Sequence, residues 1–253
     1  PNKARPVRES SVKGHLRFWW RTMQPPMEPA ELKEAENALF GSTGAASKVS
    51  LSISYLEPPT VHQFGFSARD GVTGTNRGVT YPIYALFPLI SRKQGMGVTE
   101  CTFQLTVTMT GLDKDKEDSV QNALKLWLLF GGVGARTRRG CGSLYCEEVM
   151  SEFPDMKAVK AFVEGIVARQ PPSPAWYPRL AGARIIFKKG SSKEPVEDWE
   201  HLIRDYKDFR QSRNPGTQQG RPGRSHWPEP DSIRRITGDG ASNHTPKHEA
   251  GNW

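Results

Sequence analysis

The segment Gly131–Gly142 contains five glycines, three arginines and no acidic residue within twelve positions. Glycine lets a backbone adopt positive φ angles and approach another chain closely. Free backbone N–H groups and arginine side chains together suit a polyanion such as a nucleic-acid backbone. The segment therefore predicts a phosphate-binding loop, with these candidate contacts: Gly132, Gly134, Arg136, Arg138, Arg139, Gly140 and Gly142.

The alternative interpretation of this segment is a simple turn between a helix and a strand. It is not a nucleotide-binding P-loop, because no Gly-Lys-Ser/Thr follows the glycines. It is not a dinucleotide fingerprint either, because it leaves a predicted helix and enters a predicted strand. We favour phosphate contact, since a turn alone does not explain three arginines without an acid.

A second basic group lies near the start of the chain, where Lys13, Arg17 and Arg21 recur at intervals of four residues. This spacing places them on one face of a helix predicted over 11–23. The row predicts contact with RNA phosphates, and a solvated helix face is the alternative. His15 belongs to the same helix, where a contact to phosphate or to a neighbouring side chain is favoured. It is also the best candidate for the acid or base of a metal-free ribonuclease.

A third basic segment, residues 210–235, carries six arginines against Glu229 and Asp231. An aromatic residue among arginines suits stacking on a nucleic-acid base, and an anchor in a subunit contact is equally consistent with the pattern. The candidate RNA contacts of this segment are Arg210, Arg213, Arg224 and Trp227.

Overall composition agrees with these local signals. The 253 residues carry a formal net charge of +8, clustered in the three basic segments, which favours an anionic partner. Three cysteines without a C-x-x-C spacing indicate neither a disulfide framework nor a zinc site, and we expect a reducing cytoplasm. There is no apolar run of about 18 residues, so no membrane span is expected. Nothing in the sequence indicates a cofactor.

Periodicity then predicts the elements that position these residues. Up to residue 150 it predicts helices over 11–23, 31–40 and 114–130, strands over 49–55, 81–87, 103–109 and 143–149, and a polar loop over 67–80. Later it predicts helices over 155–169 and 195–209 and a strand over 183–188. With one strand before Pro1, the first part reads β-α-β-β-α-β, a ferredoxin-like unit whose antiparallel sheet is a common RNA platform.

Several motifs resemble one known family, the first subunit of Cmr complexes, which is a RAMP-superfamily component of type III-B CRISPR effectors. Ser11-Val12-Lys13-Gly14-His15-Leu16-Arg17-Phe18-Trp19-Trp20-Arg21 is similar to its N-terminal signature. Gly132-x-Gly134 through Gly140-x-Gly142 is similar to the RAMP glycine-rich loop, which many RAMP proteins share. Two further segments are similar to the family: Phe209-Arg210-Gln211-x-Arg213, and Gly223-Arg224-Ser225-x-Trp227-Pro228-Glu229 with the residues after it.

The resemblance implies an α+β fold of two ferredoxin-like (RRM-like) domains with antiparallel sheets. Residues 1–150 would form the N-terminal domain with the glycine-rich loop, and 151–253 an incomplete second domain with a basic loop insertion. It implies a non-catalytic subunit that binds guide RNA and target RNA near the guide 3′ end, beside other Cmr subunits, in antiviral defence. The alternatives are a metal-independent endoribonuclease that uses His15 and a protein-docking subunit.

Overall fold

The structure, a computed structural model, describes residues 5–67, 71–74, 80–82, 84–86, 95–170, 177–187, 190–192 and 194–211. It is a mixed α+β fold with antiparallel sheets. The helices are α1 (Glu9–Thr22), α2 (Pro29–Phe40), α4 (Lys114–Phe130), α5 (Glu147–Met150), α6 (Met156–Val167) and α7 (Pro195–Gln211). The strands are β1 (Val49–Tyr55), β2 (Thr60–Ser67), β3 (Gly71–Gly74), β4 (Thr80–Tyr81), β5 (Gly95–Glu100) and β6 (Phe103–Met109).

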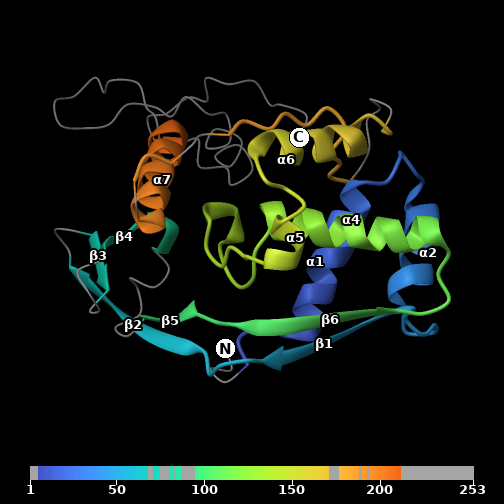
Figure 1. Ribbon diagram of the computed structural model, residues 1–253, viewed down its shortest axis with the longest axis horizontal. Helices are drawn as coiled ribbons and strands as arrows, with labels where there is room; N and C mark the ends of the chain where they lie inside the picture. Colours follow the sequence, from blue (N-terminus) through green and yellow to red (C-terminus); the bar gives the residue numbers. More distant parts are fainter. Residues whose placement is uncertain are drawn as a thin grey trace, which may run out of the picture.

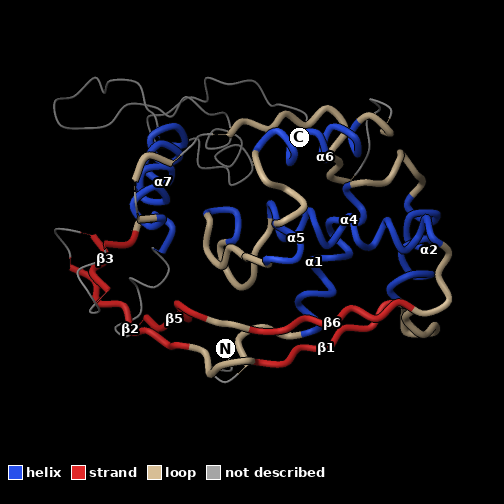
Figure 2. The backbone as a smooth tube through the Cα atoms, in the orientation of Figure 1, coloured by secondary structure: helices blue, strands red, loops and turns tan. Residues whose placement is uncertain are grey.

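The strands form a long curved ribbon along one side of the molecule (Figures 1 and 2). At one end β1 pairs antiparallel with β6, with Ile53 opposite Leu105. At the other end the order is β4-β3-β2-β5. Both strands of the β1–β6 pair were predicted from alternating residues, and both are confirmed. β2 and β5 were not predicted, although Phe64 and Phe66 alternate in β2 and Met96 and Val98 alternate in β5.

α1, α2, α4 and α6 lie over the β1–β6 end of the ribbon, and α7 stands at the β3–β4 end (Figure 1). α1 packs against α4, and their inward residues include Leu16, fully buried, and Trp127, 1% exposed. The predicted apolar spacing explains this core, because residues three and four apart share one helix face. The main core is Val7, Val12, Leu16, Trp20, Leu32, Leu39, Phe40, Val49, Ile53, Val120, Ala123, Trp127 and Tyr177.

α6 forms a further layer outside α4, so the later part of the chain packs on the earlier part. Leu126 of α4 clusters with Val163 and Ile166 of α6. Farther along, the Leu180 N–H donates to the Thr22 carbonyl at 2.9 Å, and the Tyr177 side chain lies in the main core. Residues before and after position 150 therefore pack against each other. The division into two domains at this position stays a prediction.

The five long helices agree with the sequence prediction because local signals fix their ends. Asp113 and Asp155 cap α4 and α6, each accepting a hydrogen bond from a backbone N–H three residues later. Gly41 follows α2, and its N–H donates to the Asn37 carbonyl. At the end of α1 the chain reaches Pro25, as expected for a helix stop.

The prediction of a strand over 81–87 is wrong, and so is the prediction that 67–80 is only a loop. Tyr81 ends β4, and residues 84–86 are helical because the Pro82 carbonyl accepts from Ala85 and Leu86 at 3.0 and 3.2 Å. Proline has no N–H for a sheet ladder but tolerates the first position of a helical turn. Within 67–80 the chain pairs instead, with Val72 opposite both Phe66 and Tyr81.

The predicted strands at 143–149 and 183–188 are also wrong. Residues 147–150 form α5, and residues 183–187 are irregular. A strand requires a neighbour for its backbone groups, and β1 and β6 pair only with each other among the described residues. The described part of 151–211 contains no strand, so a second ferredoxin-like sheet is not seen there.

A helix that spans a membrane must be both long and apolar. Among the described residues, no helix meets both requirements.

Candidate nucleic-acid interface

The glycine-rich loop, residues 131–142, joins α4 to the segment before α5 and is closed at its base by two hydrogen bonds. The Val133 N–H donates to the Gly142 carbonyl at 2.9 Å, and the Trp127 indole N–H donates to the Gly132 carbonyl at 3.1 Å. Gly142 has φ +69°, and a Cβ at this position would collide with the Val133 carbonyl oxygen. The base of the loop therefore requires glycine for a packing reason.

The tip of the loop presents backbone donors to solvent. Gly134 and Ala135 are exposed, and neither makes a hydrogen bond with a described residue. Arg136 follows with φ 61° and ψ 32°, a left-handed conformation that is uncommon for a residue with a side chain. One 3-10 turn, Thr137–Arg139, completes the tip. Successive N–H groups around a left-handed residue form the kind of concavity that binds anions.

The three arginines of the loop differ in what they contact. Arg138 is exposed and makes no hydrogen bond or ion pair with any described residue. Arg139 donates to the Tyr84 carbonyl, and its guanidinium lies 4.2 Å from the centre of the Tyr84 ring. Arg136 is half-buried and takes part in interactions within the protein. Arg138 is therefore the loop arginine best placed for a phosphate, whereas Arg139 is engaged in packing.

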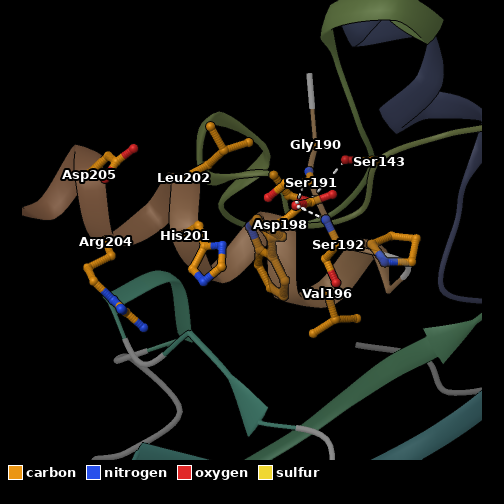
Figure 3. Close-up of a pocket in the computed structure, with 13 residues that line it drawn as sticks. Ser143, Gly190, Ser191, Ser192, Val196, Asp198, His201, Leu202, Arg204 and Asp205 are labelled. Carbon is orange, nitrogen blue, oxygen red and sulfur yellow. Dashed lines mark hydrogen bonds between the residues drawn. The ribbon is translucent and has the colours of Figure 1, made fainter. Parts of the chain in front are cut away.

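The loop also contacts α7, from the later part of the chain. The Trp199 indole N–H donates to the Arg139 carbonyl at 2.7 Å. A groove of about 750 Å³ runs along this contact, between Gly140 and Ser143 on one side and the first turns of α7 on the other (Figure 3). In this groove the Asp198 carboxylate accepts from the Ser191 and Ser192 N–H groups at 3.0 and 3.1 Å.

Two arginines of the predicted basic row on α1 are held by a buried acid. Glu36 of α2 is 7% exposed. Both carboxylate oxygens of Glu36 lie 2.8 Å from one Arg21 nitrogen, and the Oε1 oxygen also forms an ion pair with Arg17. A buried carboxylate requires such partners. The side chains of Arg17 and Arg21 keep 31% and 35% exposure, so each still presents part of its surface to solvent.

Lys13 and His15 lie on the same helix and are both partly buried. Lys13 donates to the Ser47 hydroxyl at 2.8 Å. Burial, and then the neighbouring Arg17 charge, lower the pKa of Lys13. The His15 ring stacks on Trp127, with ring centres 6.0 Å apart and planes 14° apart, and burial lowers its pKa. The α1 row is thus integrated into the packing of the helices.

The structure places the predicted C-terminal contacts only in part. Arg210 is in the last turn of α7, whereas Arg213, Arg224 and Trp227 lie outside the described residues. The described residues contain no group of three or more His, Cys, Asp or Glu side chains arranged to hold a metal ion.

Three residues of this region were missed by the sequence analysis. Glu36 could have been found, because it lies four residues after Leu32 on the inward face of its helix. Trp199 lies in the helix predicted over 195–209, but nothing in the sequence indicated its partner. No sequence signal pointed to Tyr84.

Comparison with known proteins agrees with this arrangement of a helical layer, antiparallel strands and a glycine-rich loop. The family model of the RAMP superfamily matches residues 2–145. The chain therefore belongs to the RAMP superfamily.

Its relatives include the first subunit of a Cmr complex, as the resemblance in the sequence had indicated. The CRISPR system Cmr subunit Cmr1-1 of Pyrococcus furiosus is 30% identical over 165 residues, which cover 58% of this chain. The match covers 42% of that protein, so the chain spans about two fifths of the length of its curated relative. The crystal structure of Cmr1 from Pyrococcus furiosus in its apo form is 19% identical, with a TM-score of 0.57 over 98% of this chain and 72% of that one. This likeness shows a shared fold.

Proposed function

We propose that this chain is a non-catalytic RNA-binding subunit of a type III-B CRISPR effector complex. It binds guide RNA and target RNA near the 3′ end of the guide and contacts other Cmr subunits. Membership of the RAMP superfamily and the similarity to the Pyrococcus furiosus Cmr1-1 subunit support this assignment. The net charge of +8 fits an anionic partner.

The observation that carries the proposal is the geometry of the loop tip. Gly134 and Ala135 are exposed and have N–H groups that bond no described residue, and Arg138, a few positions later in the same loop, is exposed without a partner among the described residues. Phosphate oxygens accept hydrogen bonds from both kinds of donor, and such contacts hold a strand without reading its sequence. This suits a subunit that must hold guides of many sequences.

The α1 row contributes a second set of phosphate contacts in this proposal. Glu36 fixes Arg17 and Arg21 by ion pairs, so less side-chain entropy is lost when their exposed edges meet a phosphate. Glu36 also cancels one of the two positive charges. The row should therefore contribute less to the salt dependence of binding than its three cations suggest.

The contacts of His15 favour binding over catalysis. Its ring stacks on Trp127 in the packed interface of α1 and α4, which accounts for its position without a reaction. A ribonuclease would need this imidazole within hydrogen-bond reach of the scissile 2′-hydroxyl. Purified protein incubated with labelled RNA and a chelator should therefore leave the RNA intact. Cleavage that disappears in His15→Gln would establish the endoribonuclease alternative instead.

The proposal is tested by the salt dependence of RNA binding. Arg138→Ala should reduce the slope of log affinity against log salt by about 0.7, the value expected when one fewer phosphate of a single strand is neutralised. The measurement is fluorescence anisotropy with two single-stranded RNAs of unrelated sequence, each at several salt concentrations. Affinity should fall equally for both RNAs.

The matched control is Lys33→Ala, which removes one exposed cation from α2. This helix lies at the opposite end of the molecule from α7 and the loop contacts of Trp199 (Figure 1). The Lys33→Ala variant should leave the slope of log affinity against log salt unchanged. If Arg138→Ala and Lys33→Ala change this slope equally, only overall charge matters and the loop is not the binding site.

A further inference from the structure

An element from the later part of the chain, α7, is docked on the glycine-rich loop. Trp199, in the second turn of α7, is half-buried and lies sixty positions after the residue whose carbonyl it contacts. Its indole N–H donates to the Arg139 carbonyl at 2.7 Å. Arg139 is the last residue of the 3-10 turn that carries Arg138.

The next residue in the loop is shaped around the same tryptophan. Gly140 has φ +76°, and a Cβ built there would lie 2.7 Å from the Trp199 indole nitrogen. Any side chain at 140 would therefore strain the backbone and push against the indole. The Trp199 indole nitrogen therefore lies against both the Arg139 carbonyl and Gly140.

A second chain of contacts joins the Arg139 side chain to α7. The guanidinium lies over the Tyr84 ring at 4.2 Å, and the Tyr84 ring packs against Tyr206 with centres 6.2 Å apart. Tyr206 is two turns beyond Trp199 on the same helix. Both the main chain and the side chain of Arg139 are thus held, while Arg138 beside it is exposed to solvent.

We propose that Trp199 is a positioning residue that holds the glycine-rich loop in its RNA-binding conformation. This inference rests on the proposed RNA-binding function of the loop. By fixing the Arg139 carbonyl, Trp199 orders the turn before an RNA arrives, so less conformational entropy is lost on binding. It contacts no phosphate itself. α7 thereby couples the later part of the chain to the RNA site.

The first measurement needs no RNA. Trp199→Phe keeps an aromatic ring but removes the N–H donor. Amide hydrogen exchange in the free protein should become roughly fivefold faster at Arg139 and Gly140, whose N–H groups donate within the turn at 2.8 and 3.0 Å. Leu202→Ala is the control, because this α7 side chain is 47% exposed. It should leave both rates unchanged. Unchanged exchange in a folded Trp199→Phe protein would overturn the inference, whether or not the wild type binds RNA.

The second measurement separates positioning from direct contact. Trp199→Phe and, independently, Gly140→Ala should weaken RNA binding several-fold and leave the salt slope at the wild-type value. Arg138→Ala should lower the slope instead. A slope reduced equally by Trp199→Phe and Arg138→Ala would mean that Trp199 acts through charge contacts, and would refute the positioning role. If wild-type protein binds no RNA, the proposed function fails, while the exchange experiment still decides whether Trp199 orders the loop.

Discussion

At the scale of single residues, basic side chains that look equivalent in the sequence differ in their contacts and in their exposure to solvent. Arg138 faces solvent, and Arg139 is packed on Tyr84. Arg17 and Arg21 share the buried Glu36 carboxylate. The number of basic residues therefore overstates the charge available to a polyanion, because ion pairs and packing withdraw part of it. A salt titration counts the phosphate contacts that remain.

His15 gives a pH-dependent prediction at this scale. Burial against Trp127 lowers its pKa below the ordinary value of 6.5, so the folded state favours the neutral ring. The unfolded state then binds more protons once the pH falls below 6.5. The stability that His15 contributes is therefore complete above pH 6.5 and is lost as the pH falls toward its lower folded pKa.

NMR titration of the histidine ring protons should show one midpoint below 6.5 that is absent in His15→Gln. Urea unfolding should show that the variant loses less stability than the wild type between pH 7 and a pH below 6.5. An unshifted titration of His15 would contradict its burial.

At the scale of elements, helix ends follow from local chemistry and strands do not. The Asp155 side chain accepts from the Ala158 N–H at 2.8 Å and begins α6, as the sequence predicted. Of the residues predicted as strands, 147–149 lie in α5 and 183–187 are irregular. A helix makes its hydrogen bonds within itself, whereas a strand depends on a neighbour that its own sequence does not specify.

The cap of α6 can be tested by its effect on stability. Asp155→Ala should lower the free energy of unfolding by about 1 kcal/mol, because one backbone N–H of the first turn loses its partner. Asp155→Asn keeps a side-chain oxygen acceptor and should cost much less. Urea unfolding followed by circular dichroism measures both variants. Equal destabilisation by the two would show that the carboxylate charge matters more than the cap.

At the scale of the whole molecule, the later part of the chain completes the earlier part. Val163 and Ile166 of α6 cover Leu126 of α4, and Tyr177 enters the core around α1. α7 stands at the other end of the ribbon and docks on the glycine-rich loop through Trp199 (Figure 1). The proposed RNA site is thus built from segments far apart in the sequence.

This packing predicts that residues 1–150 are not an independent unit. Removal of α6 exposes Leu126, and uncovering one leucine costs about 1.5–3 kcal/mol. A fragment of residues 1–150 should therefore melt several degrees below the full chain, or fail to unfold cooperatively. The full chain should unfold in one transition by calorimetry. A chain that ends at Gln211 keeps all these contacts and is the matched control. A fragment as stable as that control would support two separate domains.

The sequence by itself determined the five long helices, the two strands at 49–55 and 103–109, the basic segments and the RAMP resemblance. These depend on short-range spacing: residues three to four apart for helices, alternation for strands, and runs of glycine and arginine. It also indicated candidate phosphate contacts in the glycine-rich loop. Within that loop it treated Arg136, Arg138 and Arg139 as alike.

Only the tertiary structure decided which of those arginines is exposed, because Tyr84 and Trp199 reach the loop from distant segments. It also decided the role of Glu36, which is meaningful only once α1 and α2 pack. The tertiary structure also decided which strands pair with each other. β2 and β5 formed as strands where a neighbour was present, whereas 143–149 and 183–187 formed no strand. The physical reason is that arginine exposure, the ion pairs of Glu36 and strand pairing all depend on long-range contacts. The sequence of one segment does not specify which distant segment will pack against it.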